Sequence, residues 1–237
     1  MTGMLASITG VDEARLAIEC GADLIDLKDP ARGALGALDA LIARDIVATF
    51  AGAATLSATV GDFPSMEPRD VFAATRYTVE LGVDFVKVGL FGTPRDTECI
   101  QALAPLAAQA RLIAVQFADL APDLQLAGRL AEAGFAGVML DTARKEGPGL
   151  PHLMTEGQLS HFVNDARALG LIAGLAGKLR VADIAALLAL QPDYLGFRGA
   201  LCKQQQRSAE FDLEALRAVR STIPMRMPRW LRQPEWQ

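Results

Sequence analysis

Two lysines stand where a parallel-sheet enzyme could use them as nucleophiles. Lys28 ends the apolar segment LIDLK and Lys87 lies in FVKVGL, and both segments are typical of buried strands. Burial disfavours an ammonium group, and a neutral lysine amine attacks carbonyl carbons to form an imine. The alternative is that each lysine buries only its aliphatic chain and places its ammonium group in solvent, or that the ammonium pairs with a nearby carboxylate. A second lysine, and Asp26 beside Lys28, favour Schiff-base chemistry.

Further charged residues follow a later apolar segment. Asp141 ends VMLD, and Lys145 lies in the loop after it. Because side chains alternate along a strand, Asp26 and Lys28 point to the same side of the sheet. Amines held close together favour the neutral form of one of them, so one lysine could be the nucleophile and another a proton carrier. An ion-pair network that only holds the edge of the sheet together is the alternative interpretation.

Two glycine-rich segments near the end of the chain indicate a phosphate site. LAGKL contains Gly177, and GFRGALCK contains Arg198 and Gly199. Backbone N–H groups of such turns bind phosphate in many barrel enzymes, and an arginine adds a fork of donors. Each segment alone is also explained as a tight turn. Both together, beside amines, predict a phosphorylated carbonyl substrate.

The elements that must position these residues alternate between short apolar strands and amphipathic helices. The predicted strands are residues 4–7, 24–28, 55–60, 85–89, 112–117, 137–141, 171–175 and 194–197. The predicted helices are residues 12–20, 37–50, 68–81, a helix from 94, and 122–133, 156–169, 181–190 and 213–221. Eight such units predict the α/β class and a single (β/α)8 TIM barrel. An open doubly wound sheet is disfavoured because SITGVDEAR, after the first strand, is a poor match to a glycine-rich dinucleotide turn.

The barrel is predicted to occupy residues 1–223. A motif of Gly, one further residue, and Asp or Ala recurs at 21–23, 82–84 and 134–136, and we interpret it as a repeated helix-to-strand turn at the floor of the barrel. The tail 224–237 does not continue the alternation of strands and helices, and it contains both tryptophans. It is either disordered or an arm that docks on a neighbouring subunit of a homo-oligomer.

Composition excludes several classes of protein. The chain has 237 residues, 51% of them hydrophobic, and a net charge of −5, which suits a domain with a large core and disfavours nucleic-acid binding. No apolar run is long enough to span a bilayer, and the amino terminus lacks the pattern of a secretory signal. Cys20, Cys99 and Cys202 have no metal-like spacing, which indicates reduced thiols of a cytoplasmic protein.

Over nearly the whole predicted barrel the sequence resembles the (5-formylfuran-3-yl)methyl phosphate synthases. The matching segments are ADLIDLKDPARGALGA, LSATVGD, DFVKVGLFG, VMLDTARKEG, GLAGKL and GFRGALC. DLKDPARGALGA and LDTARKEG are the most specific. The resemblance implies a lyase that condenses two molecules of glyceraldehyde 3-phosphate into a furan aldehyde phosphate, with loss of one phosphate and two waters. The product would supply the furan core of methanofuran-type one-carbon carriers.

The resemblance also implies roles for particular residues. Lys28 would form the Schiff base, Lys87 would accept a proton, and Asp26, Asp141 and Lys145 would be the other important polar residues. No metal or other cofactor is expected, because the imine performs the polarisation that a metal would supply. Two alternatives remain: a class I aldolase or transaldolase-like enzyme acting on a sugar phosphate, and a non-catalytic barrel that binds sugar phosphates.

Overall fold

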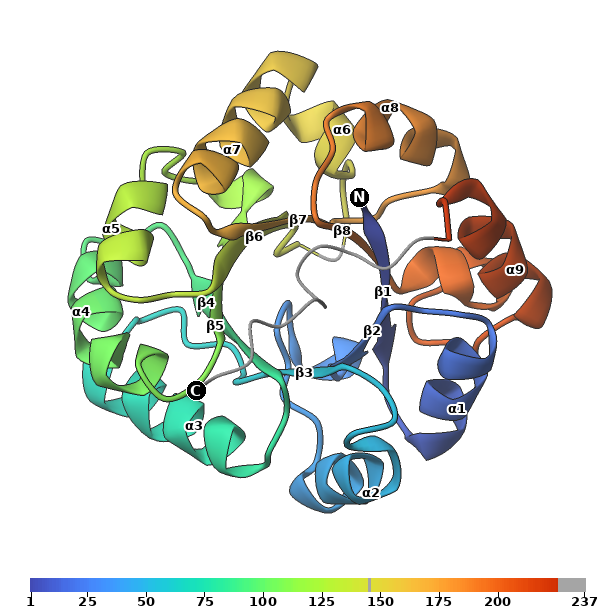
Figure 1. Cartoon of the computed structure of the whole chain (residues 1–237), viewed down its shortest axis with the longest axis horizontal. Helices are drawn as coiled ribbons and strands as arrows, with labels where there is room; N and C mark the ends of the chain where they lie inside the picture. The colour runs from blue at the N-terminus through green and yellow to red at the C-terminus, as the bar shows by residue number, and fades with distance from the viewer. Residues whose placement is uncertain (145, 226–237) are drawn as a thin grey trace.

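The computed structural model describes residues 1–144 and 146–225. Within these residues, parallel strands close into an eight-stranded barrel in the order of the sequence (Figure 1). The strands are β1 (Gly3–Ile8), β2 (Leu24–Leu27), β3 (Leu56–Thr59), β4 (Phe85–Leu90), β5 (Leu112–Phe117), β6 (Gly137–Asp141), β7 (Ile172–Leu175) and β8 (Tyr194–Phe197). The predicted TIM barrel is confirmed.

A ring of helices surrounds the barrel (Figure 1). The α-helices are α1 (Val11–Glu19), α2 (Ala40–Phe50), α3 (Pro68–Glu80), α4 (Asp96–Ala107), α5 (Ala127–Glu132), α6 (Leu150–Leu153), α7 (Glu156–Ala168), α8 (Ile184–Ala189) and α9 (Leu213–Thr222). Short 3-10 turns are η1 (Pro30–Arg32), η2 (Ala118–Leu120), η3 (Val181–Asp183), η4 (Gly199–Leu201) and η5 (Lys203–Gln205).

Several helical segments differ from the prediction. The helix expected over 37–50 begins at Ala40, and the one expected over 181–190 starts as the 3-10 turn η3 before α8. The helix expected over 122–133 begins only at Ala127, because the Asp123 carboxylate accepts a hydrogen bond from Gln125 N at 3.0 Å and closes a separate turn first. The short helix α6 was not expected. It lies in the glycine- and proline-bearing loop after β6, where a proline in its first turn fits the backbone angle that a helix needs.

Apolar side chains fill the lower part of the barrel interior. Leu24, Phe85, Ile113, Ile172 and Tyr194 are all buried in one cluster there. Gly174 is required for this packing, because a Cβ at that position would lie 2.3 Å from Tyr194 Cζ. Close packing at this level leaves the upper part of the interior, at the carboxyl ends of the strands, to the polar residues.

The repeated turn at the floor of the barrel has the predicted form. Gly21, Gly82 and Gly134 have φ of 82°, 84° and 82°, a left-handed conformation that favours glycine after a helix. The aspartate of the first turn also ties two strands together, because the Asp23 carboxylate accepts a hydrogen bond from Met4 N at 2.7 Å. The same contact joins Asp84 with Leu56 N at 2.8 Å and Asp193 with Ala173 N at 2.9 Å.

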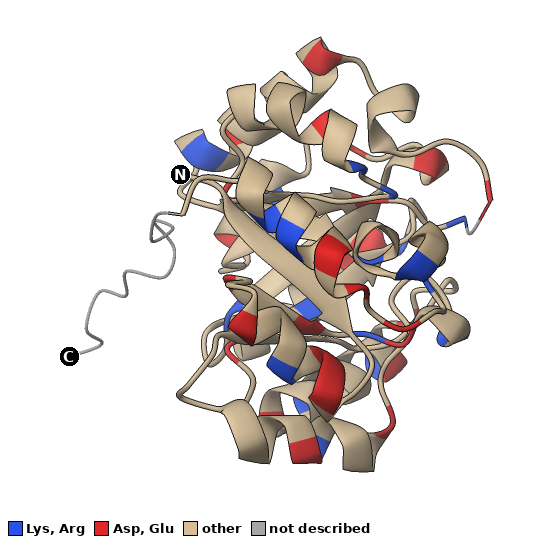
Figure 2. Ribbon diagram, turned by 90° about the vertical axis from the view of Figure 1, so that its right-hand side faces the viewer, with Lys and Arg blue, Asp and Glu red and all other residues tan. Residues whose placement is uncertain are grey.

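The outer surface of the described residues carries mixed charge. Figure 2 shows basic and acidic residues interspersed over the helices of the face that it presents. Among the helices of residues 1–144 and 146–225, none has both the length and the apolar character needed to cross a membrane. Lys145 and most of the predicted tail, residues 226–237, lie outside the described residues.

Candidate active site

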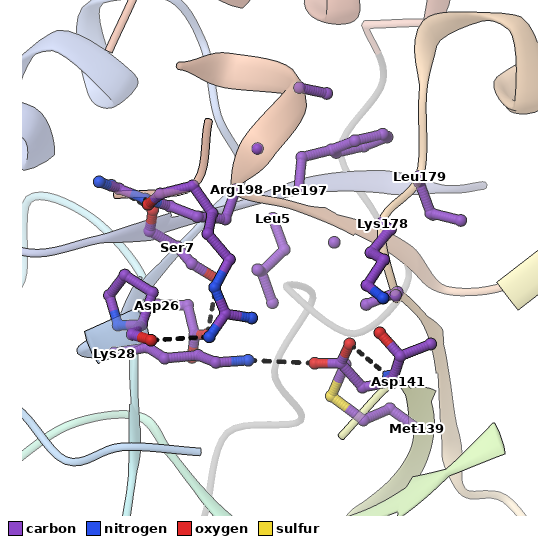
Figure 3. Close-up of a pocket in the computed structure, with 18 of the residues that line it drawn as sticks. Leu5, Ser7, Asp26, Lys28, Met139, Asp141, Lys178, Leu179, Phe197 and Arg198 are labelled. Carbon is purple, nitrogen blue, oxygen red and sulfur yellow. Dashed lines mark hydrogen bonds and ion pairs between the residues drawn. The ribbon is translucent and has the colours of Figure 1, made fainter. Parts of the chain in front are cut away.

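A cavity of about 320 Å³ opens at the carboxyl ends of the strands. Most of the predicted site residues line it: Asp26, Lys28, Lys87, Asp141, Gly177, Arg198 and Gly199. Figure 3 shows side chains from several strands converging on this space. The cavity lies where the active sites of TIM barrels are found, because each strand presents its last inward side chains to the same rim.

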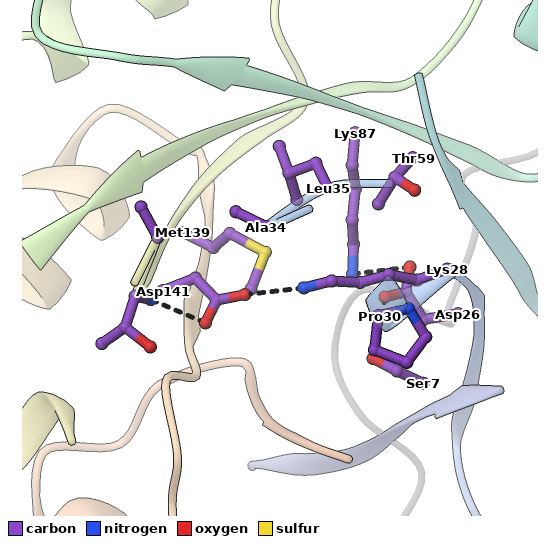
Figure 4. A network of polar contacts seen from close by, with 12 residues as sticks. Ser7, Asp26, Lys28, Pro30, Ala34, Leu35, Thr59, Lys87, Met139 and Asp141 are labelled. Atoms are coloured by element: carbon purple, nitrogen blue, oxygen red, sulfur yellow. Dashed lines mark hydrogen bonds and ion pairs between the residues drawn. The ribbon is translucent and has the colours of Figure 1, made fainter. Parts of the chain in front are cut away.

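At the bottom of the cavity, Lys87 and Asp26 form a buried ion pair. Lys87 Nζ lies 2.9 Å from Asp26 Oδ1, and the two residues are 1% and 2% exposed (Figure 4). Ser57 Oγ donates to Asp26 Oδ1 at 2.6 Å, and Ser7 Oγ donates to Oδ2 at 3.0 Å. Strand register explains the two hydroxyls, because Ser7 and Ser57 both pair with Asp26, one on each neighbouring strand. The carboxylate is thereby fixed on both of its oxygens.

Above this pair, Lys28 reaches across the barrel to Asp141. Lys28 Nζ lies 3.1 Å from Asp141 Oδ2, and the two side chains are 16% and 12% exposed (Figures 3 and 4). The other oxygen of Asp141 accepts a hydrogen bond from Thr142 N at 2.7 Å. Lys28 is therefore more accessible from the cavity than Lys87, which lies beneath it.

Burial and charge set the protonation of the lower pair. Burial acts against the ionised form of Asp26, but the charges of Lys87 and Lys28 and a hydrogen bond from Ser57 outweigh it, so the pKa of Asp26 is lowered. Burial also lowers the pKa of Lys87; Asp26 opposes that shift, and the charge of Lys28 adds to it. Lys87 consequently releases its proton more readily than an exposed lysine does, beside a carboxylate that stays ionised.

Two carboxylates at the rim hold loops rather than face the cavity. Asp62, after β3, accepts hydrogen bonds from Ala34 N at 2.8 Å and Leu35 N at 2.6 Å, in the loop that follows Lys28. Asp119, after β5, accepts from Ala143 N and Arg144 N, both at 2.8 Å, in the loop that follows Asp141. The loops that follow Lys28 and Asp141 are thus each fixed by a residue that follows the neighbouring strand.

The turns after β7 and β8 lie against the other side of the cavity. Gly177 has φ of 103°, and a Cβ there would lie 2.8 Å from Thr142 Cγ2, so glycine lets this turn approach the end of β6. A Cβ at Gly199 would lie 3.2 Å from Gln205 O, which indicates close packing of η4 against the following segment. Phosphate binding by these turns stays a prediction.

The guanidinium of Arg198 is fully engaged within the protein. Its five donors go to Glu13 Oε2 at 2.5 Å and Oε1 at 3.1 Å, and to the carbonyl oxygens of Ser7 at 3.2 Å, Arg207 at 2.8 Å and Ala209 at 3.1 Å. A phosphate role for Arg198 also stays a prediction, and it would require that some of these bonds be exchanged.

Reasoning from the sequence missed several residues of the site. Ser7 and Ser57 lie inside strands, and their contact with Asp26 follows from register, which a single sequence does not give. Arg207 lines the cavity from an irregular segment well after β8, where strand-end reasoning does not look. Glu13 comes from the first turn of α1, a segment for which the sequence predicted a helix and no site residue.

The described residues also bear on metal and thiol chemistry. In residues 1–144 and 146–225 no three His, Cys, Asp or Glu side chains are grouped so that they could hold a metal ion. The three cysteines are free thiols, and burial raises the pKa of Cys99 and of Cys202 to about 11. The titratable side chains that line the cavity include the amines of Lys28 and Lys87 and the carboxylates of Asp26 and Asp141.

Comparison with known proteins places the chain in a family. The 4-HFC-P synthase family model matches residues 4–220. A Methylorubrum extorquens protein, provisionally named a (5-formylfuran-3-yl)methyl phosphate synthase, is 46% identical over 91% of this chain and 92% of its own length. The (5-formylfuran-3-yl)methyl phosphate synthase of Methanopyrus kandleri is 35% identical over 86% of this chain and 91% of its own length.

Solved structures share the fold at much lower identity. Phosphoribosyl anthranilate isomerase from Thermus thermophilus has a TM-score of 0.65 and 18% identity, covering 94% of this chain and 98% of that one. A 3-hexulose-6-phosphate synthase has a TM-score of 0.61 and 18% identity, covering 93% and 100%. These similarities show the barrel alone, whereas the family match rests on sequence along most of the chain: the protein belongs to the (5-formylfuran-3-yl)methyl phosphate synthase family of enzymes.

Proposed function

We propose that this protein condenses two molecules of glyceraldehyde 3-phosphate into (5-formylfuran-3-yl)methyl phosphate through an imine on Lys28. The observation that carries the proposal is the stacking of two lysine–carboxylate pairs in one cavity, Lys28 with Asp141 above Lys87 with Asp26. One pair is reachable by substrate and the other is buried beneath it. This arrangement provides a nucleophile and a separate proton acceptor side by side.

The proposed reaction begins at Lys28. Asp141, 3.1 Å from Lys28 Nζ, is positioned to take the ammonium proton. The neutral amine then attacks the aldehyde carbon of the first triose, and water leaves as the imine forms. The protonated imine withdraws electrons from the neighbouring carbon and so acidifies its hydrogen.

Lys87 accepts that proton in the next step. Its lowered pKa makes the neutral amine accessible, and the ionised Asp26 stabilises the ammonium that results. The enamine expels phosphate, and the remaining three-carbon unit forms a carbon–carbon bond with the central carbon of a second triose phosphate that has isomerised from the aldehyde to the ketone. That carbon bears the phosphorylated CH2 group, so the bond places this group on carbon 3 of the furan. Ring closure and release from the lysine complete the balance: two triose phosphates give one furan phosphate, one phosphate and two waters. Such a product would supply the furan core of methanofuran-type carriers.

One incubation tests the proposal against its two alternatives. The protein is mixed with glyceraldehyde 3-phosphate, and the products are measured by mass and by near-ultraviolet absorbance, which a furan aldehyde has and a sugar phosphate lacks. Borohydride added during turnover should attach a triose to Lys28. A non-absorbing six-carbon sugar phosphate would identify an aldolase or transaldolase-like enzyme, and the absence of both product and adduct would favour a binding barrel.

A further inference from the structure

Arg207 is a half-buried arginine of the cavity whose guanidinium forms no ion pair within the described residues. Lys28 and Lys87 pair with carboxylates, and Arg198 has all its donors engaged. In the described part of the chain Arg207 forms no ion pair, and its side chain makes a single hydrogen bond, from Nη2 to Pro30 O at 2.7 Å. Most of the donors of Arg207 are therefore available to a ligand in the cavity that it lines.

The segment that carries Arg207 is held in a fixed shape. Residues 202–211 form a closed loop, because Cys202 and Phe211 pair as an antiparallel bridge and Lys203 N donates to Glu210 O at 3.0 Å. Arg198 donates hydrogen bonds to the carbonyl oxygens of Arg207 and Ala209, and a further one to Ser7 O in β1, so it links the loop to that strand. Arg207 is thus positioned before a ligand arrives, which lowers the entropic cost of binding one.

Arg207 also lies close in space to the loop that follows Lys28. Pro30, which accepts its hydrogen bond, is in the loop that begins at Lys28. Burial lowers the pKa of Arg207, while the charges of Asp141 and Asp62 act in the opposite direction and that of Arg198 adds to it. The guanidinium is half-buried, and a half-buried charge without a counter-ion is a natural site for an anion.

We propose that Arg207 binds the phosphate of the triose attached to Lys28, and that Arg198 and Glu13 position the loop that presents it. This inference rests on the proposed function, in which a phosphorylated aldehyde occupies Lys28. It makes Arg207 a specificity-determining residue. A planar fork of N–H donors recognises two phosphate oxygens at once, so phosphorylated trioses bind in preference to free sugars.

Glycerol 3-phosphate tests phosphate binding without imine formation, because it has no carbonyl group. Calorimetry should give a dissociation constant for Arg207→Met that is about tenfold to a hundredfold higher than for the unaltered protein, the range expected on losing hydrogen bonds to a charged group. Arg180→Met is the matched control, since Arg180 lines the same cavity with an exposed side chain, and its effect should stay below about threefold. Equal losses in both variants, or no loss in Arg207→Met, would overturn the inference.

Borohydride trapping separates a phosphate role from a structural one. Arg207→Met should require much more glyceraldehyde 3-phosphate for half-maximal labelling of Lys28, but the same concentration of unphosphorylated glyceraldehyde as before. Parallel losses with both aldehydes would mean that Arg207 only holds the Pro30 loop, against the inference. Should Arg207→Met not fold, Arg207→Lys replaces it; loss of the planar fork should then weaken glycerol 3-phosphate several-fold, and unchanged binding counts against the inference.

The two experiments also distinguish this inference from the proposed function. If the unaltered protein binds glycerol 3-phosphate in an Arg207-dependent way but neither aldehyde labels Lys28, the phosphate site stands and the imine mechanism fails. If Lys28 is labelled equally well in Arg207→Met at every concentration of either aldehyde, the mechanism stands and the inference fails.

Discussion

At the scale of single residues, the central feature is the difference in burial between two lysines of one cavity. Lys28 is partly exposed and faces the cavity, whereas Lys87 is 1% exposed and is fixed by Asp26. A buried ion pair is tolerated only when its charges are paired and hydrogen-bonded. Asp26 supplies the counter-charge to the Lys87 ammonium, and the hydroxyls of Ser7 and Ser57 donate to the Asp26 carboxylate. The buried lysine therefore suits proton transfer and the reachable one suits covalent chemistry.

Lys28→Arg should abolish furan formation and leave the fold intact. Arginine keeps the positive charge and can still pair with Asp141, but its guanidinium stays protonated and forms no imine. Product absorbance and borohydride labelling measure the loss, and thermal unfolding checks the fold. Turnover that survives in this variant would show that the covalent step lies elsewhere.

Lys87→Met should lower the rate by about a hundredfold to ten-thousandfold, because the proton acceptor is lost, while Lys28 still labels with aldehyde. The single variant leaves Asp26 buried without its partner, which should cost about 3–5 kcal/mol of unfolding free energy. The control is the double variant Asp26→Asn/Lys87→Met, which removes both charges and should recover much of the stability but none of the activity. Recovered activity in the double variant would contradict the assigned role.

The rate of furan formation should rise with pH and level off below the ordinary lysine value of 10.5, because Lys87 must be neutral to accept a proton and its folded pKa is lowered. The lowered pKa of Lys87 also determines how the free energy of unfolding depends on pH. Between the lowered pKa and 10.5 the unfolded chain binds more protons than the folded one, so Lys87 makes the free energy of unfolding increase with pH in that window. Initial rates across pH test the first statement, and a rate that falls through this range would oppose it.

At the scale of elements, each loop that carries chemistry is fixed by the strand next to it. Asp62 after β3 binds the loop after β2, and Asp119 after β5 binds the loop after β6. Parallel strands end at the same rim, so a carboxylate on one strand lies within reach of the free N–H groups of its neighbour's loop. These aspartates hold Lys28 and Asp141 in place through the backbone.

Asp119→Ala should loosen the backbone that follows Asp141, because two N–H groups, those of Ala143 and Arg144, lose their acceptor. We expect a loss of about 1–3 kcal/mol in unfolding free energy and a lower rate of Lys28 labelling. Hydrogen exchange at these two amides should accelerate, while exchange within β2 is unchanged. Unaltered exchange at Ala143 and Arg144 would argue against this role of Asp119.

At the scale of the whole molecule, the barrel has a packed apolar interior at one end and a polar cavity at the other, at the carboxyl ends of the strands. Tyr194 fills the interior below Lys87, with the Lys87 ammonium 5.8 Å from its ring centroid, and Tyr194 is itself 2% exposed. The apolar layer keeps water away from the lower ion pair, and the cavity above it admits substrate. Gly174 makes this division workable because it leaves room for the Tyr194 ring.

Gly174→Ala should therefore destabilise the barrel by about 1–3 kcal/mol, since the added Cβ would lie 2.3 Å from Tyr194 Cζ. The matched control is Gly157→Ala in α7, where a Cβ would meet nothing within 4 Å, and its effect should be neutral or slightly stabilising. Denaturant unfolding measures both. Equal stabilities for the two variants would mean that the barrel interior adjusts to the extra methyl group.

The sequence by itself determined the barrel and the set of residues at its mouth. Alternating apolar strands and amphipathic helices leave few topologies, and parallel strands bring Asp26, Lys28, Lys87 and Asp141 to one rim because their carboxyl ends coincide. Strand limits were predicted within a few residues for the same reason. These features depend on local pattern, which a single chain carries in full.

Only the tertiary structure decided which charges pair. Asp26 is two residues from Lys28, yet it pairs with Lys87, while Lys28 crosses the cavity to Asp141. Likewise Glu13, from α1, forms an ion pair with Arg198, whereas Arg207 lines the cavity without one. These choices depend on the register between strands and the distance across the closed barrel. Register and closure are properties of all eight strands together, so no short segment of the sequence specifies them.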